Sequence, residues 1–293
     1  MIVITAPTSQ IGSKVVDALV KTDEPLRLIV RDATRFGSAV RERVEIIEGS
    51  HGDASVVDRG FEGADAVFWL APPPWKQTLK QAYVDFSGPA ATAIRRHNVA
   101  RVLSITALGR RTAWQDRAGA VTASIEMDNL LMETGAAFRA LAMPSFMENT
   151  ARQAAVMKDK GMFFGPIRGD QKLRFTATSD MAAAAVRFLS DPSWTGQKEA
   201  PVLGPEDLSF DDQAAIISEV TGRPMRYQQI SYEQFKQQFL DRGTSESVAQ
   251  GYVDMYRAKD EGIDNVAEGT SKNTGSTSFR AFCERYLRPI LAA

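Results

Sequence analysis

The chain has 293 residues, a formal net charge of −1 and 44% hydrophobic residues. This length suits one large α/β domain or a nucleotide-binding domain with a smaller lobe. The near-zero charge gives no electrostatic basis for binding nucleic acid or an anionic membrane. The single cysteine, Cys283, excludes an internal disulfide, and with no apolar run of membrane-spanning length it indicates a cytoplasmic protein. Only two histidines occur, His51 and His97, far apart in sequence, so no metal site is expected.

The chain opens with an apolar segment at residues 2–5, a short loop and an amphipathic helix that begins near Gly12. A buried strand that turns directly into a helix leaves backbone N–H groups and the positive helix end facing one point. A dinucleotide pyrophosphate binds at such a point. The usual loop has three glycines, but here the three positions are Ala6, Ser9 and Gly12. Ala6 is tolerated if its φ angle stays negative, and the Ser9 hydroxyl either caps the helix or binds a phosphate oxygen.

A second strand is predicted at residues 26–30, and Arg31 follows it directly. An acidic residue at this place would bind the ribose 2′-hydroxyl of NAD, whereas an arginine suits the 2′-phosphate of NADP. The alternative for Arg31 is a surface ion pair with the neighbouring Asp32. We therefore expect NADP rather than NAD as the cofactor.

Further strands are predicted at residues 44–47, 66–70, 101–106 and 138–143, with helices at 76–97 and 124–134. Alternation of apolar strands and helices is typical of a doubly wound parallel sheet, the Rossmann fold. Pro72-Pro73-Pro74 ends the fourth strand at the carboxyl edge of the sheet, where ligands bind in such folds. We expect residues 1–150 to form the NADP-binding domain.

After residue 150 the regular alternation fades. Helices are predicted at 180–189, 210–221, 232–241, 245–259 and 279–287, with a strand at 225–230 and loops at 161–169 and 268–277. Residues 151–293 are therefore expected to form a smaller α+β lobe for substrate, with segments near 172–205 packing back on the first domain.

Taken together, the motifs resemble the NmrA-like family, an atypical branch of the short-chain dehydrogenases/reductases. The resemblance covers nearly the whole chain and rests on motifs at residues 5–12, 30–32, 52–53, 63–68, 70–73, 103–109, 143–149, 176–180 and 203–206. Their order and spacing carry it, since each motif alone is weakly specific.

The resemblance implies an NAD(P) site that these motifs line. The residues that would bind the phosphates are Thr8, Ser9, Gln10, Ile11, Gly12, Arg31 and Arg35. Those that would surround the adenosine are Asp53, Ala71 and Pro72. Those that would face the nicotinamide are Thr106, Ala107, Pro144, Ser145 and Phe146.

Typical members of the superfamily carry a Tyr-x-x-x-Lys pair on the helix after the fifth strand, and this helix has neither residue. The spacing does occur at Tyr232 and Lys236, but in the second lobe, where we interpret it as one face of an ordinary helix. Loss of the pair disfavours epimerase or alcohol dehydrogenase chemistry but leaves hydride transfer open.

A quinone, imine or conjugated dye accepts hydride without an acid from the protein. Thr106 is the hydroxyl expected to polarise the substrate, with Glu126 and Glu148 in reserve. Aromatic residues expected to line the substrate pocket, or else to belong to the core, are Trp75, Tyr83, Phe86, Phe146, Phe163 and Phe164. The alternative is a redox sensor that binds NADP(H) without catalysis and signals through a protein partner. In either case we expect a monomer or homodimer.

Overall fold

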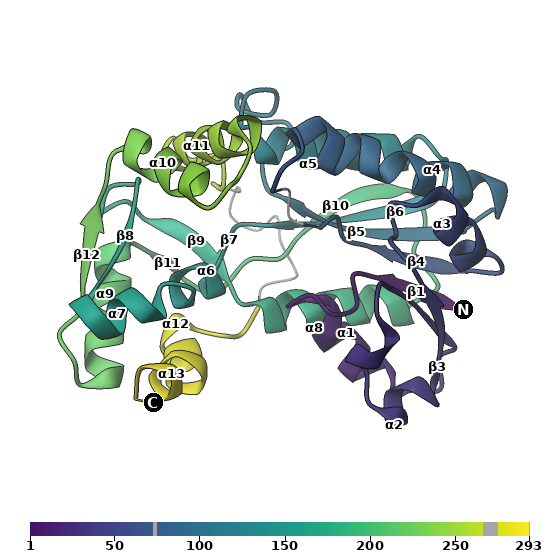
Figure 1. Cartoon of the computed structure of the whole chain (residues 1–293), viewed down its shortest axis with the longest axis horizontal. Coiled ribbons are helices and arrows are strands. Elements are labelled where there is room, and N and C mark those ends of the chain that lie inside the picture. The colour runs from purple at the N-terminus through teal and green to yellow at the C-terminus, as the bar shows by residue number, and fades with distance from the viewer. Residues whose placement is uncertain (73–74, 266–274, 293) are drawn as a thin grey trace. The chain divides into compact units, whose positions relative to one another are not determined.

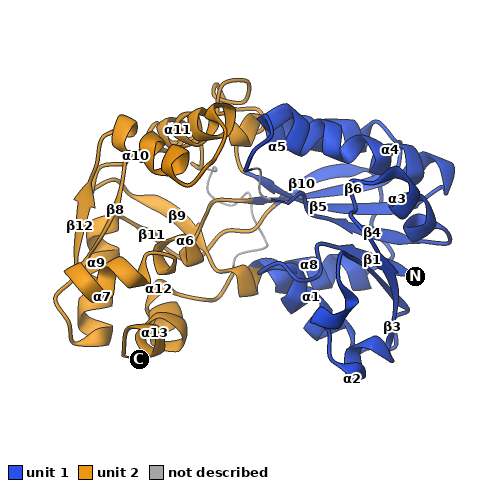
Figure 2. Cartoon of the chain, in the orientation of Figure 1, with its two compact units in different colours: residues 1–107, 123–142, 181–200 blue, residues 108–122, 143–180, 201–293 orange. Residues whose placement is uncertain are grey.

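The computed structural model describes residues 1–72, 75–265 and 275–292. Contacts divide the chain into two compact units (Figure 2). Unit 1 comprises residues 1–107, 123–142 and 181–200, and unit 2 comprises residues 108–122, 143–180 and 201–293. The chain therefore passes between the units several times.

Unit 1 is built on a seven-stranded sheet with the strand order β10-β6-β5-β4-β1-β2-β3. Its strands are β1 (Ile2–Thr5), β2 (Leu26–Val30), β3 (Val44–Glu48), β4 (Ala66–Trp69), β5 (Arg101–Ala107), β6 (Ala137–Met143) and β10 (Gln197–Pro201). β1 pairs in parallel with both β2 and β4, and β4 pairs in parallel with β5. All residues of β1 and β4 are buried, as their continuous apolar character predicts for strands covered on both faces. This order is that of the Rossmann fold.

Helices cover both faces of this sheet, as Figure 1 shows: α3, α4 and α5 lie on one face, and α1 and α8 lie on the other. Their bounds are α1 (Gly12–Leu19), α3 (Ala54–Phe61), α4 (Phe86–Arg96), α5 (Ala120–Met132) and α8 (Thr178–Ser190). The short helix α2 (Ser38–Arg41) precedes β3, and a π-helical turn (Gln81–Asp85) leads into α4. The doubly wound arrangement expected from the sequence is confirmed.

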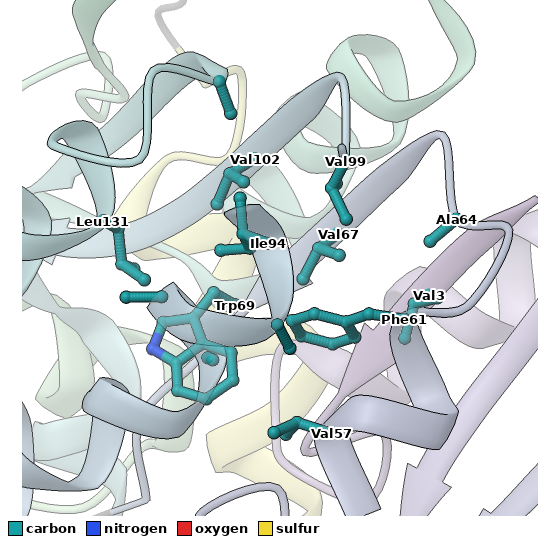
Figure 3. Close-up of a cluster of buried hydrophobic side chains, with 14 of the residues drawn as sticks. Val3, Val57, Phe61, Ala64, Val67, Trp69, Ile94, Val99, Val102 and Leu131 are labelled. Atoms are coloured by element: carbon teal, nitrogen blue, oxygen red, sulfur yellow. The ribbon is translucent and has the colours of Figure 1, made fainter. Parts of the chain in front are cut away.

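The core between the sheet and the α3–α4 layer is apolar (Figure 3). Val3, Val67 and Val102 come from three neighbouring strands, and Phe61 and Ile94 come from the helices above them. All five side chains are at most 2% exposed. Burial of a valine or phenylalanine contributes about 1.5–3 kcal/mol, so this cluster holds the layers together. It also fixes where the strand ends lie.

Unit 2 contains two small sheets, one with the order β11-β9-β7 and one in which β12 pairs in parallel with β8. The strands are β7 (Ser145–Phe146), β8 (Met162–Gly165), β9 (Leu173–Thr176), β11 (Asp207–Leu208) and β12 (Arg226–Gln229). The helices are α6 (Met147–Ala151), α7 (Ala154–Lys160), α9 (Phe210–Thr221), α10 (Tyr232–Asp241), α11 (Glu246–Asp260), α12 (Phe279–Phe282) and α13 (Arg288–Ala292), with a π-helical turn (Cys283–Leu287) between the last two. Strands and helices are mixed here, so the expected α+β character is confirmed.

One segment of unit 2 differs from its prediction. Residues 161–169 were expected to be a loop because Gly, Phe and Pro dominate them, but residues 162–165 form β8. The strand exists because β12, some sixty residues later, supplies its hydrogen-bonding partner. Of the loop predicted at 268–277, residues 268–274 lie outside the described residues. In the described part of the chain, no helix combines the length and apolar character that crossing a membrane requires.

Candidate functional site

The loop after β1 retains the backbone shape of a phosphate-binding turn although its sequence has lost two glycines. The Ser9 N–H donates to the Ala6 carbonyl at 3.0 Å, and the Ser13 N–H donates to the Ser9 carbonyl at 2.9 Å. Gly12 begins α1, and a Cβ atom there would lie 2.3 Å from the Ala6 carbonyl oxygen. No larger residue fits at Gly12 without moving the loop. The one retained glycine is thus the one that lets the helix approach the strand.

Ala6 does not keep the negative φ angle that the sequence analysis required of it. Its φ angle is 46°, in the left-handed region that favours glycine. An L-residue with a Cβ atom is less stable in this region by about 1–2 kcal/mol. The tight turn is therefore kept, and the alanine tolerates strain to keep it.

Ser9 caps the helix. Its hydroxyl oxygen accepts a hydrogen bond from the Gly12 N–H at 2.9 Å, which satisfies one of the free N–H groups of the first turn. Two other backbone N–H groups of the loop, those of Thr8 and Ile11, make no hydrogen bond to any described residue. They are donors of the kind that a pyrophosphate requires. Together with the closed space at Gly12, these donors fit a bound dinucleotide.

Arg31 directly follows β2, and its side chain is exposed. It makes no ion pair within the described residues. Asp32, the alternative partner, instead accepts hydrogen bonds from the N–H and hydroxyl of Thr34, at 2.9 and 2.6 Å, and these bonds lower the pKa of its carboxyl. Arg35 is the last residue of a short 3₁₀-helix, Ala33–Arg35, and is also exposed. Two cations are thus available at the end of β2.

Asp53 has a structural contact that the sequence analysis did not foresee. Its carboxylate caps α3 by accepting from the Ser55 hydroxyl and N–H, both at 2.8 Å, and from the Val56 N–H at 3.3 Å. These hydrogen bonds lower the pKa of Asp53. Its role beside the adenine stays a prediction. Any such contact must use the acceptor positions of the carboxylate that the three capping hydrogen bonds leave unoccupied.

Thr5 and His51 hold the end of β4, which leads to Ala71 and Pro72. The Thr5 hydroxyl donates to the Phe68 carbonyl at 2.8 Å and accepts from the Leu70 N–H at 3.1 Å. The His51 Nε2 lies 3.0 Å from the Leu70 carbonyl oxygen. Ala71 and Pro72 are half-buried beyond this anchor.

The His51 ring is packed edge-on against Trp69 and Phe86, with centroid distances of 5.3 and 4.9 Å. Burial lowers the pKa of His51 to about 4, and the charge of Arg31 lowers it further. The imidazole is therefore neutral at pH 7. The sequence alone does not indicate the aromatic pair that buries this ring.

At the end of β5, Thr106 is buried and its hydroxyl donates to the Ser124 hydroxyl at 3.0 Å. Ser124 lies on α5, the helix on which the usual Tyr-x-x-x-Lys pair would stand. A second strand-to-helix bond, from the Ser104 hydroxyl to Asp128 at 2.7 Å, runs parallel to it. Ala107 follows and is half-buried. Ser124 is a further candidate site residue, because it contacts Thr106, and the sequence analysis did not nominate it.

The residues predicted to bind the cofactor divide between the units. Thr8–Gly12, Arg31, Arg35, Asp53, Ala71, Pro72, Thr106 and Ala107 belong to unit 1. Because β5, β4, β1 and β2 are neighbours in that order, the residues that follow them share one edge of the sheet. Pro144, Ser145 and Phe146 belong to unit 2, where Ser145 and Phe146 form β7 and pair with Phe175 and Thr176 of β9. Their role beneath the nicotinamide stays a prediction.

The two reserve acids have different surroundings. Glu148 accepts hydrogen bonds from the Thr178 N–H, at 3.0 and 3.2 Å, and from the Thr178 hydroxyl. It therefore holds the first residue of α8, which is a structural role. Glu126 is exposed on α5.

Tyr232 and Lys236 of α10 have surroundings that disfavour acid–base exchange with a substrate. Burial and the nearby Asp260 raise the pKa of Tyr232 to about 12, the opposite of what an acid–base tyrosine needs. Lys236 forms an ion pair with Glu246 of α11. This contact supports the interpretation of the pair as one face of an ordinary helix.

The aromatic residues expected around the substrate do not form a single group. Tyr83 and Phe86 pack against the core of unit 1, and Trp75 is 51% exposed. Phe163 and Phe164, on β8, line a hollow within unit 2. The hollow contains Ser145 as well, so one predicted site residue lies with them.

These features define the class of protein as one with a Rossmann fold and a strand-to-helix loop that fits a dinucleotide. Comparison with known families narrows this class. A family model described as NAD(P)H-binding matches residues 7–192, and the model of the NmrA-like family matches residues 126–276. The chain therefore belongs to the NmrA-like family, and its cofactor is NAD(P)H.

One relative and two solved structures are similar to this chain over nearly its whole length. It is 29% identical to the NAD(P)H azoreductase of Xenophilus azovorans over 285 residues, which cover 97% of this chain and 96% of that protein. The structure of a nucleoside-diphosphate-sugar epimerase from Staphylococcus aureus matches with a TM-score of 0.82 and 16% identity, over 97% and 99% of the two chains. The NADPH complex of an NADPH-dependent quinone oxidoreductase from Escherichia coli matches with a TM-score of 0.80 and 20% identity, over 96% and 97%. Both structural likenesses show the fold.

Proposed function

We propose that this protein is an NADPH-dependent reductase that transfers hydride to a small conjugated acceptor, such as a quinone, an imine or an azo compound. The left-handed backbone of Ala6 is the observation that carries the proposal. Strained backbone conformations cluster at functional sites, where the surrounding structure holds them in place. Here the strain maintains a turn whose only evident use is to let a pyrophosphate approach the helix.

The choice of NADPH over NADH rests on the end of β2. Arg31 and Arg35 are exposed cations at the position where an NAD-specific site would place an acid. Because Asp32 is occupied with Thr34, it does not neutralise Arg31 through an ion pair. A guanidinium binds a phosphate through paired, charge-assisted hydrogen bonds.

The choice of acceptor rests on the acid–base groups that this site lacks. No tyrosine or lysine occurs on α5, and Tyr232 holds its proton too tightly to exchange it readily near neutral pH. Epimerases and alcohol dehydrogenases need a positioned acid or base, whereas a conjugated acceptor can take its proton from water. The azoreductase relative is named for a reduction of this kind.

In this proposal the protein positions its reactants and excludes water. The free N–H groups of Thr8 and Ile11 bind the pyrophosphate, and Arg31 binds the 2′-phosphate. NADPH, once bound, supplies the hydride. To polarise the acceptor, the Thr106 hydroxyl turns its single hydrogen from Ser124 to the acceptor.

Consumption of NADPH, followed by its absorbance, tests the proposal with methyl red as the azo acceptor and menadione as the quinone. We expect acceptor-dependent consumption, and no epimerisation of UDP-glucose. Thr106→Val, which keeps the side-chain shape, should lower kcat about tenfold or more while leaving NADPH affinity unchanged. Thr92→Val, at an exposed position of α4, is the matched control. Tight NADPH binding without consumption by any acceptor of this class would instead support the non-catalytic sensor.

A further inference from the structure

Unit 2 contains a hollow of about 60 Å³. Five of its elements contribute aromatic rings to the lining, namely Phe163, Phe164, Phe175, Phe210, Phe235 and Tyr256. Among the described residues that line it, none carries a charge. A hollow of this kind favours a neutral aromatic group and disfavours phosphates and sugar nucleotides.

The rings around the hollow are held by one another. Phe210 meets Phe163 and Phe175 edge-on, at centroid distances of 6.4 and 5.7 Å, and stacks on Tyr227 at 4.6 Å. Phe235 packs against Tyr256 at 4.7 Å. Aromatic pairs at such distances stabilise beyond the burial of their area, so the lining is organised before a ligand binds.

One side of the hollow is lined by polar side chains, and these differ in which of their hydrogen-bonding groups already have a partner. Gln153 donates one amide N–H to the Phe164 carbonyl at 2.9 Å and accepts from the Phe164 N–H at 3.1 Å, and Thr150 donates to Gln213 at 2.8 Å. The Ser145 hydroxyl makes no hydrogen bond to another described residue. The Asn149 carbonyl oxygen accepts from Arg152 at 3.1 Å, and its NH₂ group donates to no described residue. Ser145 and Asn149 therefore offer two free donors.

We infer that this hollow binds one end of the acceptor, a single neutral aromatic ring that carries a hydrogen-bond acceptor such as a carbonyl oxygen or an azo nitrogen. This inference rests on the proposed function and names the class of acceptor. The ring edge lies among the phenylalanines, and the Ser145 hydroxyl and Asn149 NH₂ group donate to its polar atom. A cavity of about 150 Å³ holds a whole benzene, so a hollow of this size takes one ring edge and not a fused ring system.

The interaction can be measured without turnover. Acetophenone, a single ring with a carbonyl, is titrated into the protein without cofactor, and binding is followed by ligand-observed NMR. Cyclohexyl methyl ketone, which keeps the carbonyl but has no aromatic ring, is the matched control. We expect acetophenone to bind at least threefold more tightly than the control ketone.

Substitutions of residues that line the hollow test whether acetophenone binds there. Asn149→Leu removes the free NH₂ group, and Phe164→Leu removes a half-buried ring of the lining. Each should weaken acetophenone about threefold to tenfold, the range expected for one neutral hydrogen bond or one aromatic contact. Ser190→Ala and Phe188→Leu, both in unit 1, lie outside the hollow and should bind acetophenone as the unchanged protein does. Unaltered affinity in Asn149→Leu and in Phe164→Leu would overturn the inference.

Failure of this inference differs from failure of the proposed function. If acetophenone binding depends on these variants but no NADPH is consumed, the result supports the binding site and contradicts the proposed reductase activity. Consumption of NADPH with methyl red, whose rings are single and not fused, at a KM that is the same in Asn149→Leu, Phe164→Leu and the unchanged protein would support the reductase and contradict this acceptor site.

Discussion

The Ser9 hydroxyl accepts a hydrogen bond from the Gly12 N–H at 2.9 Å, across the turn that joins β1 to α1. Ser9 stands where the usual loop has glycine, so a side chain here replaces one backbone contact that a phosphate would otherwise make. The helix end is thus already partly satisfied before the cofactor arrives. The free N–H groups of Thr8 and Ile11 are left to bind the pyrophosphate.

Ser9→Gly tests the consequence of this bond. Removal of the cap should lower the free energy of unfolding by only a few tenths of a kcal/mol, because glycine is itself tolerated at helix caps. NADPH affinity should stay unchanged or improve, since the Gly12 N–H becomes free for phosphate. Calorimetric titration measures it. A large loss of affinity would show that the serine hydroxyl itself binds the phosphate.

Ala6→Gly should stabilise the protein although it deletes a methyl group. At a φ angle of 46° the alanine is strained, and glycine relieves that strain, so we expect a gain of about 1 kcal/mol in the free energy of unfolding. Urea denaturation measures this gain. Ala39→Gly, at an exposed position of α2 with ordinary helical backbone, is the control and should not stabilise. A loss of stability in Ala6→Gly would contradict the strain.

Arg31→Ala should weaken NADPH much more than NADH. A hydrogen bond to a charged group contributes about 1.5–3 kcal/mol, which corresponds to roughly a tenfold to hundredfold loss for NADPH. Titration of both cofactors measures the difference, with Arg41→Ala as an exposed control on α2. Equal losses for the two cofactors would rule out a contact between Arg31 and the 2′-phosphate.

His51 should make stability depend on pH below neutrality. Its folded-state pKa, about 4, is lower than its ordinary value of 6.5, so between these values the unfolded chain binds more protons than the folded one. Stability contributed by the neutral ring is therefore full above pH 6.5 and falls by up to about 3 kcal/mol as the pH drops to 4. In His51→Gln this part of the pH dependence of urea unfolding should disappear. His97→Gln, changed at the other histidine, should retain it; equal curves for His51→Gln and the unchanged protein would contradict the assignment.

Tyr232→Phe and Lys236→Met, combined in one variant, should leave reductase turnover intact. The tyrosine pKa is raised to about 12, and the lysine pairs with Glu246, so neither group is poised to exchange protons with a substrate. Steady-state rates with menadione compare the variant with the unchanged protein. A circular dichroism spectrum confirms that the variant is folded. Abolished turnover in a folded variant would restore the pair as catalytic.

The fold follows from the sequence wherever periodicity is strong. β1, β2, α9 and α10 begin and end where the pattern predicts, because each buries a continuous strand or one clear helical face. β8 was missed because a strand flanked by glycine and proline depends on β12 for its existence. Pairing between segments so far apart leaves no local signal.

The site was only partly predictable. The phosphate loop and Arg31 each directly follow a predicted strand. Their places at strand ends can therefore be read from the sequence. The Ser9 cap, the Asp53 cap and the Glu148 bond to Thr178 depend on side-chain geometry, which residue types alone do not specify. Likewise, the free donors of Ser145 and Asn149 can be identified only when the hydrogen bonds of the surrounding side chains are known.

The most direct test of this account is a calorimetric titration of the unchanged protein with NADPH and with NADH, after removal of any co-purified nucleotide. The account predicts that NADPH binds at least tenfold more tightly, because Arg31 and Arg35 face a 2′-phosphate that NADH lacks. Binding of neither cofactor would show that Ala6 and Ser9 close the phosphate loop, and it would contradict the proposed reductase.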